Sequence, residues 1–98
     1  MADLRKLARG QPCMVRIPGV CTGDTETVVL AHYRLSGLCG TGMKPPDLIG
    51  AWCCSACHDC ADFRARSPAH MMRMEIRLAH AEGVLRTIAR LLEMGAVK

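Results

Sequence analysis

The nine residues 52–60, with the sequence WCCSACHDC, constrain this chain more than any other segment. Four cysteines and a histidine in nine positions form a dense set of soft metal ligands. Cys54 and Cys57 have the C-x2-C spacing that lets two thiolates converge on one tetrahedral ion. Cys57 and Cys60 have the same spacing, but Cys60 lies nearly a full helical turn beyond Cys57, so we prefer the first pair. A metal site is therefore the predicted centre of the fold.

The same segment places a histidine beside the thiolates. Residues 49–53 are apolar and predict a short strand, and Ser55 fits the N-cap of a helix that continues to about Arg66. The positive end of that helix favours the thiolate form that a metal needs. His58 projects about 100° away from Cys57 around the helix. Its imidazole can therefore serve a different site from that of the thiolates.

Two further cysteines complete a set of four. Cys13 and Cys21 flank a proline-glycine turn signal at positions 18–19, which predicts two short β-like pieces folded back on each other. An isolated cysteine is often a small buried hydrophobe. With Cys54 and Cys57, however, these two make a four-thiolate set suited to a structural Zn²⁺.

Length and cysteine usage favour a metal over disulfides. A chain of 98 residues predicts one domain with a modest core that needs a staple. Its seven cysteines are an odd number, and no apolar leader with a cleavage site is apparent, so we expect a reducing, cytoplasmic setting. No apolar run is long enough to cross a membrane. Cys39, Cys53 and Cys60 are expected outside the zinc shell.

The charge pattern favours a phosphate-bearing partner. The net charge is +4, and ten of the 13 basic residues are arginines, whose planar guanidinium suits bidentate phosphate contact. A solvated basic surface is the alternative. Three aromatic residues are too few for a base-stacking platform, so we expect binding led by duplex or phosphate contacts.

Around the metal segment the chain predicts three more elements. Residues 2–9 predict a short helix, and residues 25–34 predict a strand with His32 near its end. Residues 36–47 contain three glycines and two prolines and predict an irregular loop. That loop carries Lys44, a candidate phosphate contact, and Asp47, a candidate ligand or orienting carboxylate.

The C-terminal third predicts a long helix. Ser67 fits its N-cap and Pro68 its first helical position, while Gly83 is a weak point at which the helix could break into two. Apolar residues recur at alternating spacings of three and four, which predicts a core face or a helix-pairing seam. These residues are Met71, Met74, Leu78, Ala81, Leu85, Ile88 and Leu92.

The order of these features resembles the HNH branch of the His-Me finger (ββα-metal) nucleases. A cysteine turn, a strand ending in His32, a loop with Asp47, an apolar strand and a C-x2-C pair followed by His58 are shared with that group. The segments VLAH (29–32), GTGMKPPDLIGAW (40–52) and CSACHD (54–59) are similar to the YbcO-type family of small prophage nucleases. The resemblance implies an α+β fold: a zinc-stapled ββα core over residues 1–66 and a helical extension over 67–95.

The resemblance also implies a metal-dependent endonuclease that hydrolyses DNA phosphodiester bonds. His32 would be the general base, and His58 would bind a divalent ion, Mg²⁺ or Mn²⁺. Asp47 stands where asparagine is usual, and it would orient His32 or ligate the metal, with Asp59 as an alternative ligand. Ala31 departs from the acidic or histidine ligand of many HNH enzymes.

The expected partner is duplex or branched DNA, with Arg34, Lys44 and Arg64 as nucleic-acid contacts and with a homodimer through the C-terminal helix. Two other classes compete. A non-catalytic zinc-stapled module that binds nucleic acid or protein needs the thiolates and the basic surface, but not two histidines at one cavity. A redox protein needs C-x2-C thiols that are free of zinc.

Overall fold

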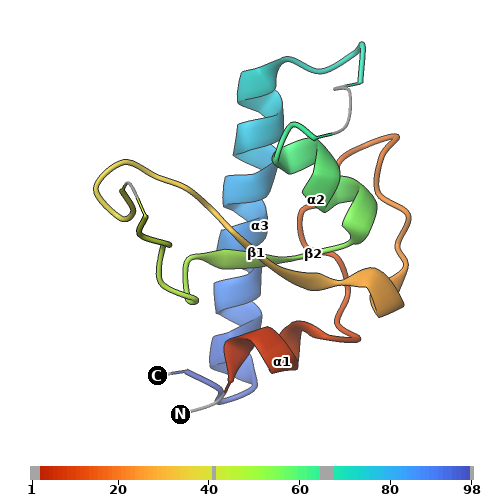
Figure 1. The fold of residues 1–98 in the computed structure, drawn as a ribbon. Coiled ribbons are helices and arrows are strands. Elements are labelled where there is room, and N and C mark those ends of the chain that lie inside the picture. The colour runs from red at the N-terminus through yellow and green to blue at the C-terminus, as the bar shows by residue number, and fades with distance from the viewer. Residues whose placement is uncertain (1–2, 41, 65–67, 98) are drawn as a thin grey trace.

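The computed structural model describes residues 3–40, 42–64 and 68–97 and has the predicted α+β architecture (Figure 1). Two antiparallel strands cross the middle of a long C-terminal helix, and a shorter helix follows the second strand. In chain order the elements are α1 (Leu4–Ala8), the 3-10 helix η1 (Thr25–Thr27), β1 (Val29–His32), β2 (Gly50–Cys53), α2 (Ser55–Ala61) and α3 (Arg73–Glu93).

The sheet is short and is buried by the long helix. Leu30 of β1 pairs with Trp52 of β2, and His32 pairs with Gly50. All four residues of β2 are buried, and the backbone N–H of Trp52 donates to Thr87 Oγ1 on α3 at 3.0 Å. This contact fastens the sheet to α3. The predicted second strand is thus confirmed, one residue shorter than expected.

The first strand is shorter than residues 25–34 because a capped turn precedes it. The Asp24 carboxylate accepts the backbone N–H of Glu26 at 3.0 Å and starts η1. Only residues 29–32 are extended. At the N-terminus, the Asp3 carboxylate accepts two backbone N–H groups and caps α1, so the helix predicted over residues 2–9 is confirmed over residues 4–8.

The segment between Cys13 and Cys21 turns as predicted but forms no strands. The Cys21 N–H donates to the Ile17 carbonyl at 2.9 Å, which closes the turn at positions 18–19. Arg16 has a left-handed backbone, with φ of 56°, which breaks any extended run. The Met14 N–H donates to the Trp52 carbonyl at 2.7 Å. The segment is therefore held against β2 and α3 instead of folding into a hairpin of its own.

Helix α2 begins and ends differently from the prediction. Cys54 is its N-cap, and Ser55 is its first helical residue, with its N–H donated to Thr27 Oγ1 at 3.2 Å. The helix ends at Ala61, because Phe63 has a left-handed backbone with φ of 59°. The predicted end at Arg66 was wrong, and Arg66 itself lies outside the described residues.

Helix α3 begins later than predicted and does not break. The predicted cap, Ser67, lies outside the described residues, and Pro68 is not helical. The Met72 N–H donates to the Glu75 carboxylate at 2.9 Å and starts the helix. Gly83 is buried within an uninterrupted helix, and a Cβ there would lie 2.8 Å from Val15 Cγ2. The glycine permits a close approach of backbones instead of marking a break.

Four of the seven residues of the predicted apolar stripe face away from the core, whereas Met71 and Ile88 pack against it. Met74 is 78% exposed and Leu85 is 66% exposed, and Leu78 and Leu92 are more than half exposed as well. The buried face is instead made of Ile76, His80, Gly83, Val84, Thr87 and Leu91. Residues two positions apart lie about 200° apart around a helix, so these four exposed residues lie opposite the buried face. The term outer stripe is used below for Met74, Leu78, Leu85 and Leu92.

Among the described residues, no helix combines the length and the apolar character needed to span a membrane.

Candidate metal centre and histidine site

The structure brings the four predicted cysteines together. Cys13 and Cys21 come from the loop after α1, Cys54 caps α2, and Cys57 lies in its first turn. Their four Sγ atoms all lie within 4.8 Å of one another. The Cys21 and Cys54 sulfurs are 4.0 Å apart, close to the roughly 3.8 Å expected between two thiolates on a tetrahedral Zn²⁺. The cluster fits a structural zinc that clamps the N-terminal loop to α2.

The other three cysteines lie outside this cluster. Cys53 and Cys60 are buried, and burial raises the pKa of the Cys60 thiol. The Cys39 Sγ approaches the Leu35 carbonyl at 3.7 Å within the loop between the strands. Buried neutral thiols pack as small apolar side chains.

His32 is paired with Asp47. His32 is the last residue of β1, and its Nε2 lies 2.8 Å from Asp47 Oδ1. The hydrogen bond to His32 lowers the pKa of Asp47, and the charge of Arg5, whose Nε lies 3.4 Å away, lowers it further. A carboxylate only accepts hydrogen bonds, so Nε2 of His32 carries the proton and Nδ1 is left able to accept one. The pair therefore has the chemistry of an oriented base.

His58 is paired with a residue that sequence reasoning missed. Its Nε2 lies 3.1 Å from Asp62 Oδ2, one helical turn further along. Asp59, the predicted alternative, instead contacts Arg64 at 3.2 Å. The i,i+4 spacing of His58 and Asp62 was the available signal, because side chains four apart share a helix face and adjacent ones do not.

The 3.1 Å between His58 Nε2 and Asp62 Oδ2 is an ordinary hydrogen-bond length, and it would also suit two adjacent ligands of a divalent ion. Two ligands bound at about 2.1 Å and at right angles would be roughly 3.0 Å apart. Among the described residues, the four cysteines are the only group of three or more potential ligands. A divalent ion at His58 would therefore take its remaining ligands from water and from a phosphate, as Mg²⁺ commonly does.

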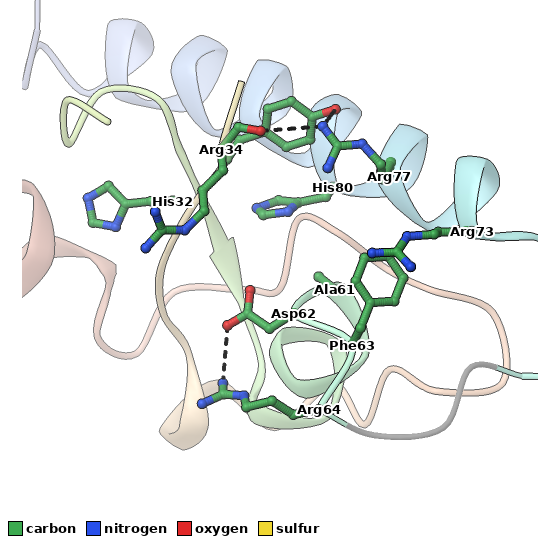
Figure 2. A pocket seen from close by; sticks show the side chains of 10 residues that line it. His32, Arg34, Ala61, Asp62, Phe63, Arg64, Arg73, Arg77 and His80 are labelled. Carbon is green, nitrogen blue, oxygen red and sulfur yellow. Dashed lines mark hydrogen bonds and ion pairs between the residues drawn. The ribbon is translucent and has the colours of Figure 1, made fainter. Parts of the chain in front are cut away.

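Both histidines line one open cavity of about 420 Å³, called the histidine cavity below. Arg5, Arg34 and Lys44 also line it, and Asp62 is its one acidic residue. Of the predicted nucleic-acid contacts, Arg34 and Lys44 thus lie beside the histidines. Arg64 lines a neighbouring cavity, seen in Figure 2.

A third histidine supports the strand beneath this cavity. His80 of α3 is buried, and its Nε2 lies 3.0 Å from the carbonyl oxygen of Ala31. Burial lowers the pKa of His80 and keeps its ring neutral, so Nε2 donates the hydrogen bond. Because Ala31 precedes His32, this bond holds the backbone that carries the His32 imidazole.

The fold and site define a class of protein: a small α+β domain with a four-cysteine cluster and two carboxylate-paired histidines at a basic cavity. The family described as "Putative nuclease YbcO" matches residues 2–96, and the chain belongs to that family. The resemblance to the YbcO-type family inferred from the sequence is thereby confirmed.

Individual relatives span the whole chain. It is 56% identical over 98 residues to "Putative nuclease YbcO" of Escherichia coli (strain K12), covering 100% of this chain and 99% of the relative. The same values hold for "Putative nuclease ybcO" of Enterobacteria phage 82. A solved structure described as "Structure of a putative bacteriophage protein from Escherichia coli str. K-12 substr. MG1655" is similar with a TM-score of 0.78 and 44% identity. It covers 95% of this chain and 100% of that chain.

Proposed function

We propose that this protein is an HNH-type, metal-dependent endonuclease that hydrolyses phosphodiester bonds in duplex or branched DNA. The observation that carries the proposal is the histidine cavity, where His32 and His58 lie together, each beside its own carboxylate. The names of the relatives support the same class. A catalytic role explains these two histidines better than a structural role does, because both rings are only partly buried and lie at an open, basic surface.

His32 acts as the general base. Asp47 holds the proton on Nε2, so Nδ1 takes a proton from the attacking water. Histidine is the side chain that most often serves as a general base. Asp47 is thus a positioning residue that fixes the tautomer and the ring orientation.

His58 and Asp62 would hold the divalent ion, Mg²⁺ or Mn²⁺. When bound, such an ion polarises a phosphate and stabilises the leaving oxygen. The chain's own contribution is to place these two ligands across the cavity from the base and to attract the DNA backbone with Arg34 and Lys44. Arg64 orients Asp62 through a contact of 3.4 Å.

The competing function is a non-catalytic zinc-stapled module that binds nucleic acid or protein. The cysteine cluster and the basic cavity would serve that function equally well. The His32–Asp47 pair favours the enzyme, since binding alone does not require a carboxylate that fixes a histidine tautomer. A redox role is disfavoured because both members of the C-x2-C pair belong to the four-cysteine cluster.

We further propose that residues 1–98 act as one nuclease domain in the cytoplasm, with residues 67–95 completing a core that residues 1–66 begin. The outer stripe then pairs α3 with α3 of a second copy. Its members, at positions 74, 78, 85 and 92, fall on a and d positions of one heptad repeat, and such a coiled-coil seam is complementary to itself. All four side chains are large, apolar and more than half exposed.

The deciding experiment incubates zinc-loaded protein with duplex, nicked and branched DNA in Mg²⁺, Mn²⁺ or Ni²⁺. Cleavage that requires a divalent ion and disappears in His32→Ala would support the enzyme. Cleavage unchanged in His32→Ala would point to a contaminant or another site. Binding without cleavage of any substrate would favour the non-catalytic module.

A further inference from the structure

A second cavity of about 420 Å³ adjoins the histidine cavity on the side of α3 (Figure 2). The two cavities share three lining residues, His32, Arg34 and Asp62, so they are neighbours. Its charged lining consists of four arginines and one carboxylate. The arginines are Arg34, Arg64, Arg73 and Arg77, and we call this space the arginine cavity.

Two of these arginines are held in place by aromatic rings. The Arg73 guanidinium carbon lies 4.1 Å from the centroid of the Phe63 ring. The Arg77 guanidinium carbon lies 4.9 Å from the centroid of the Tyr33 ring, and its Nη2 donates to the Tyr33 hydroxyl at 3.2 Å. Arg77 also donates to the Arg34 carbonyl at 3.3 Å. Figure 2 shows both guanidinium groups projecting from α3, with that of Arg73 beside the Phe63 ring.

The charge of these two arginines is not neutralised within the part of the chain that the structure describes. Arg64 contacts the carboxylates of Asp59 and Asp62. No such ion pair is found for Arg73 or Arg77 among residues 3–40, 42–64 and 68–97. Two like charges at i and i+4 repel each other and destabilise the helix slightly. An anion bound in the arginine cavity would offset the repulsion between Arg73 and Arg77.

We propose that the arginine cavity binds a second phosphate of the DNA strand, adjacent to the phosphate that lies between His32 and His58. This inference rests on the proposed nuclease function and extends its site. Planar guanidinium groups held by ring stacking offer fixed, bidentate donors for phosphate oxygens. Arg73 and Arg77 each occupy one face of the Phe63 and Tyr33 rings, which favours contacts with the DNA backbone over stacking with bases. Arg34 lines both cavities and links the two phosphate positions.

The strand therefore crosses the protein from Lys44, at the histidine cavity, towards α3. A phosphate bound on the far side of His32 holds the scissile phosphate in line with the attacking water. This restraint raises the cleavage rate as well as the DNA affinity. Such contacts carry no base information, so the inference predicts binding that is independent of DNA sequence.

The test measures DNA affinity without cleavage. Arg73→Gln and Arg77→Gln are made in a His32→Ala background, and fluorescence anisotropy with a labelled duplex is recorded over a salt series with no added divalent ion. Each substitution should weaken binding several-fold, equally for different sequences, and lower the slope of log K against log salt by about 0.9. Arg90→Gln is the matched control, because Arg90 lies on the same helix, is exposed and is paired with Glu93 at 3.1 Å.

Affinity and salt slope unchanged in both Arg73→Gln and Arg77→Gln would overturn the inference, and so would a failure of the His32→Ala protein to bind DNA. Circular dichroism melting checks the fold. If Arg77→Gln is unfolded through loss of its bonds to Tyr33 and Arg34, Arg73→Gln alone decides. Arginine-dependent binding without cleavage by the wild-type protein would sink the nuclease proposal while supporting the phosphate site. Cleavage with arginine-independent binding would do the reverse.

Discussion

Nε2 of His32 lies 2.8 Å from Oδ1 of Asp47, although 15 positions separate the two residues in the chain. The two residues meet because the irregular loop between β1 and β2 turns back and brings Asp47 to the end of β1, where His32 lies. Asp47 also accepts a contact from Arg5 at 3.4 Å, so three separate segments meet at one carboxylate.

The first prediction concerns this pair. His32→Ala should lose roughly 10²- to 10⁴-fold in cleavage rate, the usual contribution of a general base, while zinc content and DNA affinity stay unchanged. Asp47→Asn should lose less, because the base remains but its tautomer is no longer fixed. Single-turnover cleavage with excess enzyme measures both rates.

The lowered pKa of Asp47 adds a stability test. The carboxylate contributes stability above its unfolded pKa near 3.8, and this contribution is lost as the pH falls through the lower folded value. Since the carboxylate is 40% exposed, the difference between wild type and Asp47→Asn should be at most about 1 kcal/mol at pH 7. Urea titrations that show the same difference at pH 7 and at pH 2.5 would contradict the ion pair.

The second prediction is that the four-cysteine cluster holds zinc and that the fold depends on it. Cys57→Ser should remove the metal and unfold the protein, because ligand binding here is folding free energy and a small domain has only about 5–15 kcal/mol in total. Metal analysis and circular dichroism measure the two effects. Cys39→Ser is the control and should keep about one zinc per chain. A folded, zinc-free Cys57→Ser protein would refute this role.

The third prediction is that Gly83→Ala lowers stability, although replacing a glycine within a helix by alanine usually raises it. Helix propensity alone would make Gly83→Ala stabilising by about 1 kcal/mol. The added Cβ would meet Val15 Cγ2 at 2.8 Å and the Met14 carbonyl oxygen at 3.1 Å, and overpacking of this kind costs about 1–3 kcal/mol. We therefore expect a net loss of stability in urea denaturation.

Ala89→Gly on the exposed side of the same helix is the control for propensity. It should cost about 1 kcal/mol, in the ordinary direction. If Gly83→Ala proved more stable than wild type, the close contact between α3 and the Met14–Val15 backbone would be wrong.

The fourth prediction concerns pH and His80. Burial lowers the pKa of His80 below its ordinary value of 6.5. The unfolded chain then binds a proton at a higher pH than the folded protein. The stability from His80 is complete above pH 6.5 and is lost as the pH falls below that value.

His80→Gln keeps a donor for the Ala31 carbonyl but does not titrate. Its melting temperature should fall less between pH 7.5 and pH 5.5 than that of the wild type. Equal falls would mean that His80 is not buried as a neutral ring, because every other residue is the same in both proteins.

The fifth prediction concerns the outer stripe of α3. Wild-type protein should sediment as a dimer, and Leu85→Asp should sediment as a folded monomer with a similar melting temperature, since Leu85 is 66% exposed within one chain. Arg90→Gln, exposed but outside the stripe, should remain dimeric. A monomeric wild type would remove the proposed pairing.

The metal centre was largely predictable from the sequence. Four thiolates that converge form a site for one metal ion. The C-x2-C spacing of Cys54 and Cys57 at a helix start can be read from the local sequence. Cys13 and Cys21 followed from the turn signal between them, although the flanking backbone is not β. The two strands were predictable for the same reason, because their apolar runs are local.

The buried face of α3 was not predictable from the periodicity of its apolar residues. The helix has two apolar faces, and the one with the larger side chains is exposed. The buried face contains Gly83, His80 and Thr87, which local patterns count as poor core residues. Each of the three has a particular neighbour. Gly83 leaves space for Val15, His80 donates to the Ala31 carbonyl, and Thr87 accepts from the backbone N–H of Trp52.

The candidate active site divides in the same way. The sequence was enough to name His32, His58 and Asp47, because the strand, loop and helix order carries them. Asp62 could also have been named from its i,i+4 spacing to His58, whereas the arginine cavity was decided by the tertiary structure. How α3 crosses the sheet determines that Arg73 and Arg77 face the same space as Arg34. Contacts between segments distant in the chain leave no periodic trace in it, so only the packed molecule reveals them.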